Sequence, residues 1–131
     1  MSGPPEAEWP LVLVVDDNDR NRKLAADLLR AAELRTLEAG SGAEAVELAA
    51  IHAPDVILMD LGLPDMDGVQ ALALLRGEGR TARIPVVVMS AQPLEASGNR
   101  LLAVGFAGWL EKPIRVSAFA DEVRSYCLPA G

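Results

Sequence analysis

Cysteine is almost absent from this chain of 131 residues, in which Cys127 is the single thiol. One thiol excludes an internal disulfide, so the fold has to depend on its hydrophobic core. Half of the residues are hydrophobic, which is enough for such a core. The free thiol and the lack of a secretory signal are typical of the reducing cytosol, and we expect a cytoplasmic protein.

Long hydrophobic runs and basic clusters are also missing. The apolar runs are about five residues long, far short of the roughly 20 that cross a bilayer, so no membrane contact is expected. The formal net charge is −7, and the arginines are scattered among carboxylates. Direct nucleic-acid binding usually requires a basic stripe or patch, so it is not expected either.

Lysine is scarce among the basic residues: of the 12, only Lys23 and Lys112 are lysines. A chain so biased to arginine keeps lysine where a compact, flexible ammonium matters. Taken singly, Lys112 is still read most simply as a solvated surface residue. Only its arrangement together with the other residues that end apolar runs favours a functional role.

Four apolar runs end on residues that phosphoryl chemistry can use. The runs are residues 11–15 before Asp16 and Asp17, residues 55–59 before Asp60, residues 85–89 before Ser90, and residues 106–111 before Lys112. Short apolar runs rich in Val and Ile are typical of strands buried on both faces of a parallel sheet. Ligands bind outside the carboxyl ends of such strands, so three carboxylates, a hydroxyl and an ammonium are predicted to share one edge of the sheet.

Helical patterns alternate with these runs. A weaker strand is expected at residues 35–38, and helices are expected to start at Asp19, Ser41, Asp67, Pro93 and Val116, the last running to Cys127. Apolar spacing predicts buried helix faces that include Leu24, Ile51 and Val69. Right-handed crossovers then give one α/β domain with helices on both faces of a parallel sheet. We expect a flexible lead over residues 1–10, the domain over residues 11–127, and a tail over residues 128–131.

Three carboxylates held together raise one another's pKa unless a cation lies among them. Mg²⁺ is the expected occupant, with Mn²⁺ as an alternative, because it takes oxygen ligands and often shares its shell with a phosphate. Asp60 is then a candidate nucleophile that forms an acyl phosphate, while Lys112 and Ser90 stabilise the transferred group. Each residue alone has a structural reading, such as Asp16 and Asp17 capping a helix. The joint arrangement carries the inference.

Four stretches of the sequence resemble the receiver domain of two-component response regulators. They are residues 13–18 (LVVDDN), 58–68 (LMDLGLPDMDG), 89–91 (MSA) and 108–114 (GWLEKPI). The resemblance extends over residues 11–127, nearly the whole chain. It implies a flavodoxin-like (CheY-like) fold, a doubly wound sheet of five parallel strands in the order 2-1-3-4-5. It also implies a phosphoryl group received from a histidine on a sensor kinase or a histidine phosphotransfer protein.

The same resemblance implies a role for each residue at the centre of the predicted site. Asp60 would be the phosphoacceptor, and Lys112 would bind a phosphoryl oxygen. Asp17 and Asp60 would ligate Mg²⁺ by their side chains, Gly62 by its backbone carbonyl, and Asp16 through a metal-bound water. Such a protein catalyses its own phosphorylation and dephosphorylation, and it is not a multiple-turnover enzyme in the usual sense.

Residues around that centre would control access to the site and switch the surface. The resemblance implies that Ser90 is the switch hydroxyl and Trp109 the switch aromatic. It also implies that the small Ala91 leaves room for the phosphoryl group and that residues 62 and 92, here Gly62 and Gln92, influence the access of water. The Lys112–Pro113 peptide bond would be cis. Phosphorylation would draw Ser90 inward and let Trp109 fill the space, unless that ring stays fixed. The fourth helix, fifth strand and last helix would bind an unknown output protein or support a weak phosphorylation-dependent dimer of an otherwise monomeric protein.

Three other functions fit parts of the pattern. A phosphohydrolase of the haloacid-dehalogenase type uses a similar set with Mg²⁺, but its nucleophile ends the first strand in an Asp-x-Asp arrangement, whereas Asp16 and Asp17 are adjacent. A flavin or nucleotide carrier needs a first turn that cradles phosphate, and the acidic turn from Asp16 to Asp19 repels it. A receiver that acts without phosphorylation is disfavoured because no residue of the set is missing. No residues remain for an output domain, so we expect a stand-alone receiver, with a fragment of a longer regulator as the alternative.

Overall fold

Five parallel strands form one sheet in the order β2-β1-β3-β4-β5, which confirms the predicted flavodoxin-like architecture. The computed structural model describes residues 5–90, 98–112 and 114–127. The strands are β1 (Leu11–Val15), β2 (Arg35–Ala39), β3 (Val56–Asp60), β4 (Val86–Ser90) and β5 (Gly108–Glu111). The helices are α1 (Asp19–Ala31), α2 (Gly42–His52), α3 (Gly68–Arg76), α4 (Gly98–Val104) and α5 (Phe119–Tyr126), with a short 3₁₀ helix η1 (Glu6–Glu8) before β1.

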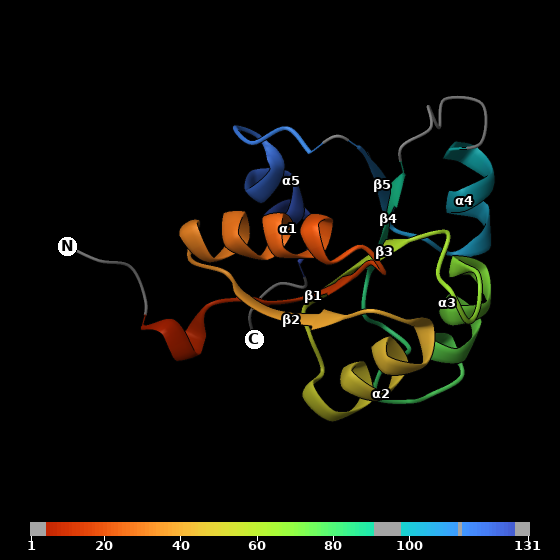
Figure 1. Cartoon of the computed structure of the whole chain (residues 1–131). Coiled ribbons are helices and arrows are strands. Elements are labelled where there is room, and N and C mark those ends of the chain that lie inside the picture. The colour runs from red at the N-terminus through yellow and green to blue at the C-terminus, as the bar shows by residue number, and fades with distance from the viewer. Residues whose placement is uncertain (1–4, 91–97, 113, 128–131) are drawn as a thin grey trace.

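Helices cover both faces of the sheet, with α1 and α5 on one face and α2, α3 and α4 on the other (Figure 1). Successive strand residues point to opposite faces. Leu13 and Val15 therefore pack toward the α2 face, and Val12 and Val14 pack toward the α1 face. All four side chains are at most 1% exposed. This burial on both faces explains why the strand reads as a continuous apolar run.

The cap of α1 differs from the prediction. Asn18, not Asp19, is the N-cap, and its side-chain oxygen accepts a hydrogen bond from the backbone N–H of Asn21 at 3.0 Å. Asp19 is instead the first helical residue, and its carboxylate pairs with Arg22 at 2.6 Å. Asn and Asp are almost equally good caps, so their order in the sequence did not decide between them.

The predicted starts of α2 and α3 are confirmed. The Ser41 hydroxyl accepts a hydrogen bond from the backbone N–H of Glu44 at 3.2 Å, and the Glu44 carboxylate turns back to the N–H of Gly40 at 2.7 Å. Asp67 and Gln70 form a reciprocal capping box with distances of 2.8 and 3.0 Å. These caps fix the points at which the chain leaves the loops after β2 and β3.

Several helix residues that the apolar spacing predicted to be buried are exposed. The exposed fractions of Leu24, Ile51 and Val69 are 46%, 62% and 42%. Likewise, α5 begins at Phe119, and Val116 before it is 67% exposed. Small residues allow a helix to approach the sheet closely, and alanines form much of the buried faces of α1, α2 and α3: Ala25, Ala26, Ala45, Ala49 and Ala71.

The described part of the predicted lead, residues 5–10, contains η1 and contacts the β2 edge of the sheet. Arg35 donates from its side-chain Nε to the carbonyl oxygen of Trp9 at 2.9 Å and from its backbone N–H to that of Pro10 at 2.8 Å. These contacts hold the chain in place as it enters β1. Among the described residues, no helix has the length and apolar character needed to cross a membrane.

Candidate functional site

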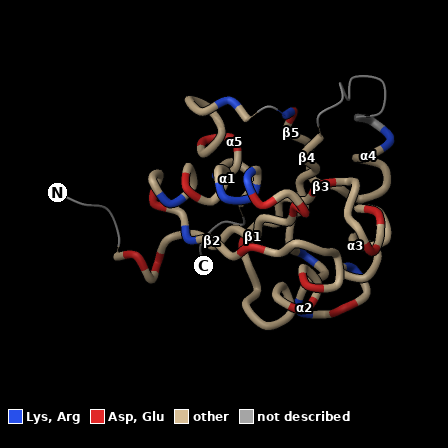
Figure 2. Tube along the Cα trace, viewed as in Figure 1, with Lys and Arg blue, Asp and Glu red and all other residues tan. Residues whose placement is uncertain are grey.

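Four of the predicted side chains lie at the carboxyl edge of the sheet. Asp60 and Ser90 are the last residues of β3 and β4, Asp16 directly follows β1, and Lys112 directly follows β5. The parallel register pairs Ser90 with Glu111, so the ends of β4 and β5 are level. Figure 2 shows acidic residues where β1 and β3 end and a basic residue after β5. The shared edge that the sequence predicted is therefore present.

Lys112 links two carboxylates at this edge. Its Nζ lies 2.8 Å from Oδ2 of Asp16 and 3.4 Å from Oδ2 of Asp60. The exposed fractions of the Lys112, Asp16 and Asp60 side chains are 16%, 4% and 21%. Burial acts to lower the pKa of Lys112, but the hydrogen bonds and charges of Asp16 and Asp60 outweigh it and raise that pKa above its ordinary value. Lys112 is therefore an ammonium at neutral pH.

Backbone contacts fix both partners of this ion pair. The backbone N–H of Lys112 donates to the carbonyl oxygen of Ser90 at 2.7 Å, which ties the end of β5 to the end of β4. The N–H of Asp16 donates to the carbonyl oxygen of Ala39 at 3.1 Å. The Oδ1 atom of Asp16 accepts from the N–H of Asn18 at 2.9 Å. Since Oδ2 of Asp16 pairs with Lys112, both of its oxygens have protein partners.

Asp16, Asp17 and Asp60 form an acidic cluster, in which one carboxylate oxygen from each residue lies within 4.8 Å of the others. Asp16 is buried, Asp60 is half-buried and Asp17 is exposed, so the cluster opens to solvent on the Asp17 side. Oxygen donors of this kind suit Mg²⁺, which usually takes one or two carboxylates and keeps several waters. Lys112 balances only part of the negative charge, and the donor set fits a divalent cation.

Gly62 contacts Asp60 through its backbone, and the space beside its own Cα is open. Its backbone N–H donates to Oδ1 of Asp60 at 3.2 Å, so both oxygens of the Asp60 carboxylate have partners. A Cβ atom at Gly62 would meet no heavy atom within 4 Å. Gly62 also forms an isolated antiparallel bridge with Asp67, which closes the loop between β3 and α3.

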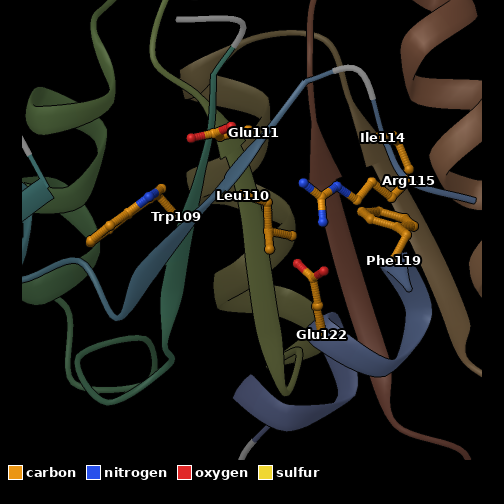
Figure 3. Close-up of a pocket in the computed structure, with 7 residues that line it drawn as sticks. All are labelled: Trp109, Leu110, Glu111, Ile114, Arg115, Phe119 and Glu122. Atoms are coloured by element: carbon orange, nitrogen blue, oxygen red, sulfur yellow. The ribbon is translucent and has the colours of Figure 1, made fainter. Parts of the chain in front are cut away.

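Ser90 and Trp109, the predicted switch residues, are both half-buried on neighbouring strands. Trp109 packs against the core on the α4 face, which includes Leu101 of α4 and Phe106. Its ring points to the opposite side of β5 from Leu110 (Figure 3). The ring of Trp109 therefore lies on the face of the sheet that α2, α3 and α4 cover.

Other predicted positions fall outside the described residues. They are the site-access residues Ala91 and Gln92, the helix start at Pro93, and Pro113 of the Lys112–Pro113 peptide bond. Their assigned roles stay predictions. The described part of the fourth helix begins at Gly98.

A pocket on the α5 side of β5 lies apart from the acidic cluster. Its lining includes Leu110, Ile114, Arg115, Phe119 and Glu122, as Figure 3 shows. None of the acidic cluster residues is among those that line it. The pocket therefore belongs to the predicted output face and not to the site at the strand ends.

Arg22 of α1 contacts the site and was missed by the sequence pattern. Its Nη1 atom donates to the backbone carbonyl oxygen of Asp16 at 2.8 Å. The same guanidinium pairs with Asp19 at 2.6 Å and with Glu38 of β2 at 3.2 Å. It thus supports the peptide unit that joins Asp16 to Asp17. No spacing or motif distinguishes this arginine from the others, because the contact depends on how α1 packs beside β2.

Comparisons with known proteins agree with this geometry. The family model of the response regulator receiver domain matches residues 12–124. The polar-differentiation response regulator DivK of Brucella ovis is 36% identical over 115 residues, which cover 88% of this chain and 94% of that protein. The chemotaxis response regulator CheY4 of Vibrio cholerae has a TM-score of 0.82 at 26% identity, over 90% of this chain and 98% of that one.

A second solved structure bears on the metal. The receiver domain of a sensor histidine kinase of Pseudomonas aeruginosa PAO1 is described with a magnesium ion coordinated in its active site cleft. It has a TM-score of 0.80 at 27% identity, over 90% of this chain and 97% of that one. Receiver domains bind Mg²⁺ at their acidic site, and the acidic cluster of this chain has the donor set for it.

The fold and the acidic cluster together define a CheY-like receiver domain. Because the family match spans most of the chain, this protein belongs to the response regulator receiver domain family. The cluster of Asp16, Asp17 and Asp60 fits the phosphoryl-accepting site of that family.

Proposed function

We propose that this chain accepts a phosphoryl group from a phosphohistidine donor onto Asp60 and later loses it by hydrolysis. The observation that carries the proposal is the position of Lys112, whose Nζ lies 2.8 Å from Asp16 and 3.4 Å from Asp60. A half-buried ammonium beside a half-buried carboxylate is suited to bind an oxygen of a group that is transferred to that carboxylate. The donor would be a sensor histidine kinase or a histidine phosphotransfer protein.

The transfer is a displacement at phosphorus. A carboxylate oxygen of Asp60 forms the new bond to phosphorus while the bond from phosphorus to the donor's imidazole nitrogen breaks, and that nitrogen keeps the electron pair. Lys112 leaves Asp60 and binds a phosphoryl oxygen. In the later hydrolysis, the oxygen of a water forms a bond to phosphorus while the bond from phosphorus to the Asp60 oxygen breaks, so that inorganic phosphate leaves and the Asp60 carboxylate is restored.

Asp17, Asp60 and the backbone carbonyl of Gly62 would hold Mg²⁺, with Asp16 acting through a bound water. This division agrees with burial, because Asp16 is buried, whereas Asp60 is half-buried and Asp17 is exposed. When bound, the ion supplies positive charge that offsets the charges of the carboxylates and of the phosphoryl oxygens.

We also propose that phosphorylation is read at the surface through Ser90 and Trp109. Trp109 packs against the buried cluster to which Leu101 of α4 belongs, so a change in its rotamer would alter the packing on the α4 side of the sheet. The face made by α4, β5 and α5 would then bind an output protein, or a second copy of the chain, in the cytoplasm. The half-buried position of Trp109, beside the buried cluster that includes Leu101, supports this route.

The test is incubation with acetyl phosphate and Mg²⁺, followed by intact mass measurement. We expect a gain of about 80 Da, the mass of one phosphoryl group, in the native chain. The gain should disappear in Asp60→Asn and persist in Asp27→Asn, whose carboxylate is on the exposed face of α1 and pairs with Lys23. No gain with either acetyl phosphate or a competent phosphohistidine donor would contradict the proposal, and turnover of a phosphate ester would indicate a phosphohydrolase.

A further inference from the structure

The loop between β3 and α3, residues 61–67, carries Gly62, the proposed carbonyl ligand of the metal. Two contacts within this segment shape the loop. Gly62 forms an antiparallel bridge with Asp67, and the N–H of Gly68 donates to the carbonyl oxygen of Leu61 at 3.1 Å. Both contacts are local in sequence. They set the form of the loop, but they do not fix its position relative to Asp16 and Asp17 on the other side of the site.

Asp65 supplies a longer-range contact. Its Oδ1 accepts a hydrogen bond from the backbone N–H of Gly42 at 2.8 Å, and its Oδ2 accepts one from the N–H of Ala43 at 2.9 Å. Both donors belong to the first turn of α2, where backbone N–H groups have no partner within the helix. The two hydrogen bonds lower the pKa of Asp65 below its ordinary value. Its negative charge is also favourable at a helix N-terminus.

Packing reinforces the same contact. Gly42 is buried, and a Cβ atom added to it would collide with the side chain of Met66, the neighbour of Asp65. A larger residue at position 42 would therefore displace the Met66 side chain or the part of the loop that carries it. A glycine is needed here for close approach, not for an unusual backbone angle.

The start of α2 is itself tied to the β1 side of the site. β2 leads to α2 through Gly40 and Ser41, and the carbonyl oxygen of Ala39 at the end of β2 accepts from the N–H of Asp16 at 3.1 Å. A continuous set of contacts thus runs from Asp16 through the end of β2 and the start of α2 to Asp65. It ends at the loop that carries Gly62.

We propose that Asp65 is a positioning residue, which holds the Gly62 carbonyl in place against the acidic cluster by anchoring its loop to α2. The inference rests on the proposed function, because that function assigns the metal-ligand role to Gly62. Asp65 need not touch the metal or the phosphoryl group to act in this way. Its removal would let the loop move and would weaken the binding of Mg²⁺.

The test is a comparison of Mg²⁺ affinity, measured by isothermal titration calorimetry, in three variants and the native chain. Asp65→Ala removes both contacts with α2, and Asp65→Asn keeps the shape but loses the charge and one acceptor. Ser41→Ala is the matched control, because it removes the other side-chain cap of the same helix without touching the loop. We expect Mg²⁺ binding to weaken about tenfold in Asp65→Ala, less in Asp65→Asn, and by less than about twofold in Ser41→Ala.

Amide hydrogen exchange provides a second readout that does not depend on the metal. Without Mg²⁺, Asp65→Ala should speed exchange in residues 61–67, whereas Ser41→Ala should speed it in the first turn of α2 alone. If Asp65→Ala does not fold, Gly42→Ala tests the same contact from the side of the helix, and it should weaken Mg²⁺ binding as well.

Two results would overturn the inference while leaving the proposed function intact. One is a native Mg²⁺ affinity in Asp65→Ala. The other is an equal loss of Mg²⁺ affinity in Asp65→Ala and Ser41→Ala, which would show that only the stability of α2 matters. A native chain that neither binds Mg²⁺ nor accepts a phosphoryl group would instead overturn the proposed function, and this inference with it.

Discussion

Two groups of ion pairs in this protein contain the same chemical partners in different surroundings. On the outer face of α1, Lys23 lies 2.9 Å from Asp27, and the two side chains are 75% and 51% exposed. At the carboxyl edge of the sheet, Lys112 lies 2.8 Å from Asp16, and these side chains are only 16% and 4% exposed. Because the two distances are alike, the difference between the pairs is their burial. The exposed pair contributes little to the free energy of unfolding, whereas the charges of the less exposed pair act strongly on a group bound beside them.

The two ion pairs also differ in the other residues that they contact. Asp27 has a second, longer pairing at 3.9 Å with Arg30 on the same helix. Lys112 also contacts Asp60, and its backbone is bound to Ser90, so it joins segments that are far apart in sequence. Contacts across the sheet hold the ammonium in one place, whereas the contacts on α1 lie within one helix and compete with water.

The largest expected effect is on phosphorylation. Lys112→Ala should slow phosphorylation of Asp60 by acetyl phosphate by at least about 100-fold, because it removes a fixed positive charge from the transferred group. Lys23→Ala is the matched control on α1 and should react at the native rate. Rates come from the time course of intact mass. A rate within about twofold of native in Lys112→Ala would show that the ammonium is dispensable.

The next effect concerns the metal. Asp16→Asn should weaken Mg²⁺ binding about tenfold, because it removes a carboxylate that would orient a metal-bound water and pair with Lys112. Asp27→Asn changes the same functional group on α1 and should leave Mg²⁺ affinity unchanged. Calorimetric titration measures both. Equal affinities in the two variants would place the metal away from Asp16.

A smaller effect should appear in the pH dependence of stability. The pKa of Lys112 is raised in the fold, so its pairing contributes stability that is fully present below the unfolded pKa of about 10.4 and is lost as pH rises through the higher folded value. The difference in unfolding free energy between the native chain and Lys112→Met should therefore stay constant from neutral pH to about pH 10 and shrink above it. Urea unfolding at a series of pH values, without Mg²⁺, measures this difference. A difference that grows in alkali would contradict the assignment.

The smallest effect is expected on α1. Lys23→Ala should change the free energy of unfolding by no more than about 0.5 kcal/mol, and added salt should reduce that change further. Urea unfolding at low and high ionic strength checks this. A loss of several kcal/mol would mean that exposure does not set the strength of these pairs.

The parallel α/β architecture and the shared edge of the site could be predicted from the sequence because both follow from local signals, whereas the strand order came from the resemblance to receiver domains. Val-rich runs specify buried parallel strands, and parallel strands bring their carboxyl ends to one edge. The contact between Lys112 and Asp60, which are separated by 52 residues, follows from that topology alone.

Two kinds of detail could not be predicted. The first is which face of each helix is buried. Leu24 is exposed while Ala25 is buried, because several neighbouring residues are apolar and tertiary packing determines which of them face the sheet. Contacts from side chain to distant backbone were the other, such as Arg22 to the Asp16 carbonyl and Asp65 to α2. Such contacts depend on how a helix packs beside a loop or strand, which no periodicity encodes.

The most direct test of the account is to locate the phosphoryl group after transfer from a phosphohistidine donor. The phosphorylated protein can be reduced with borohydride, which acts on acyl phosphates, and its peptides can then be mapped by mass. We expect one modified residue, Asp60 at the end of β3, in the native chain and none in Asp60→Asn. A phosphoryl group on any other residue, or its undiminished transfer to Asp60→Asn, would contradict it.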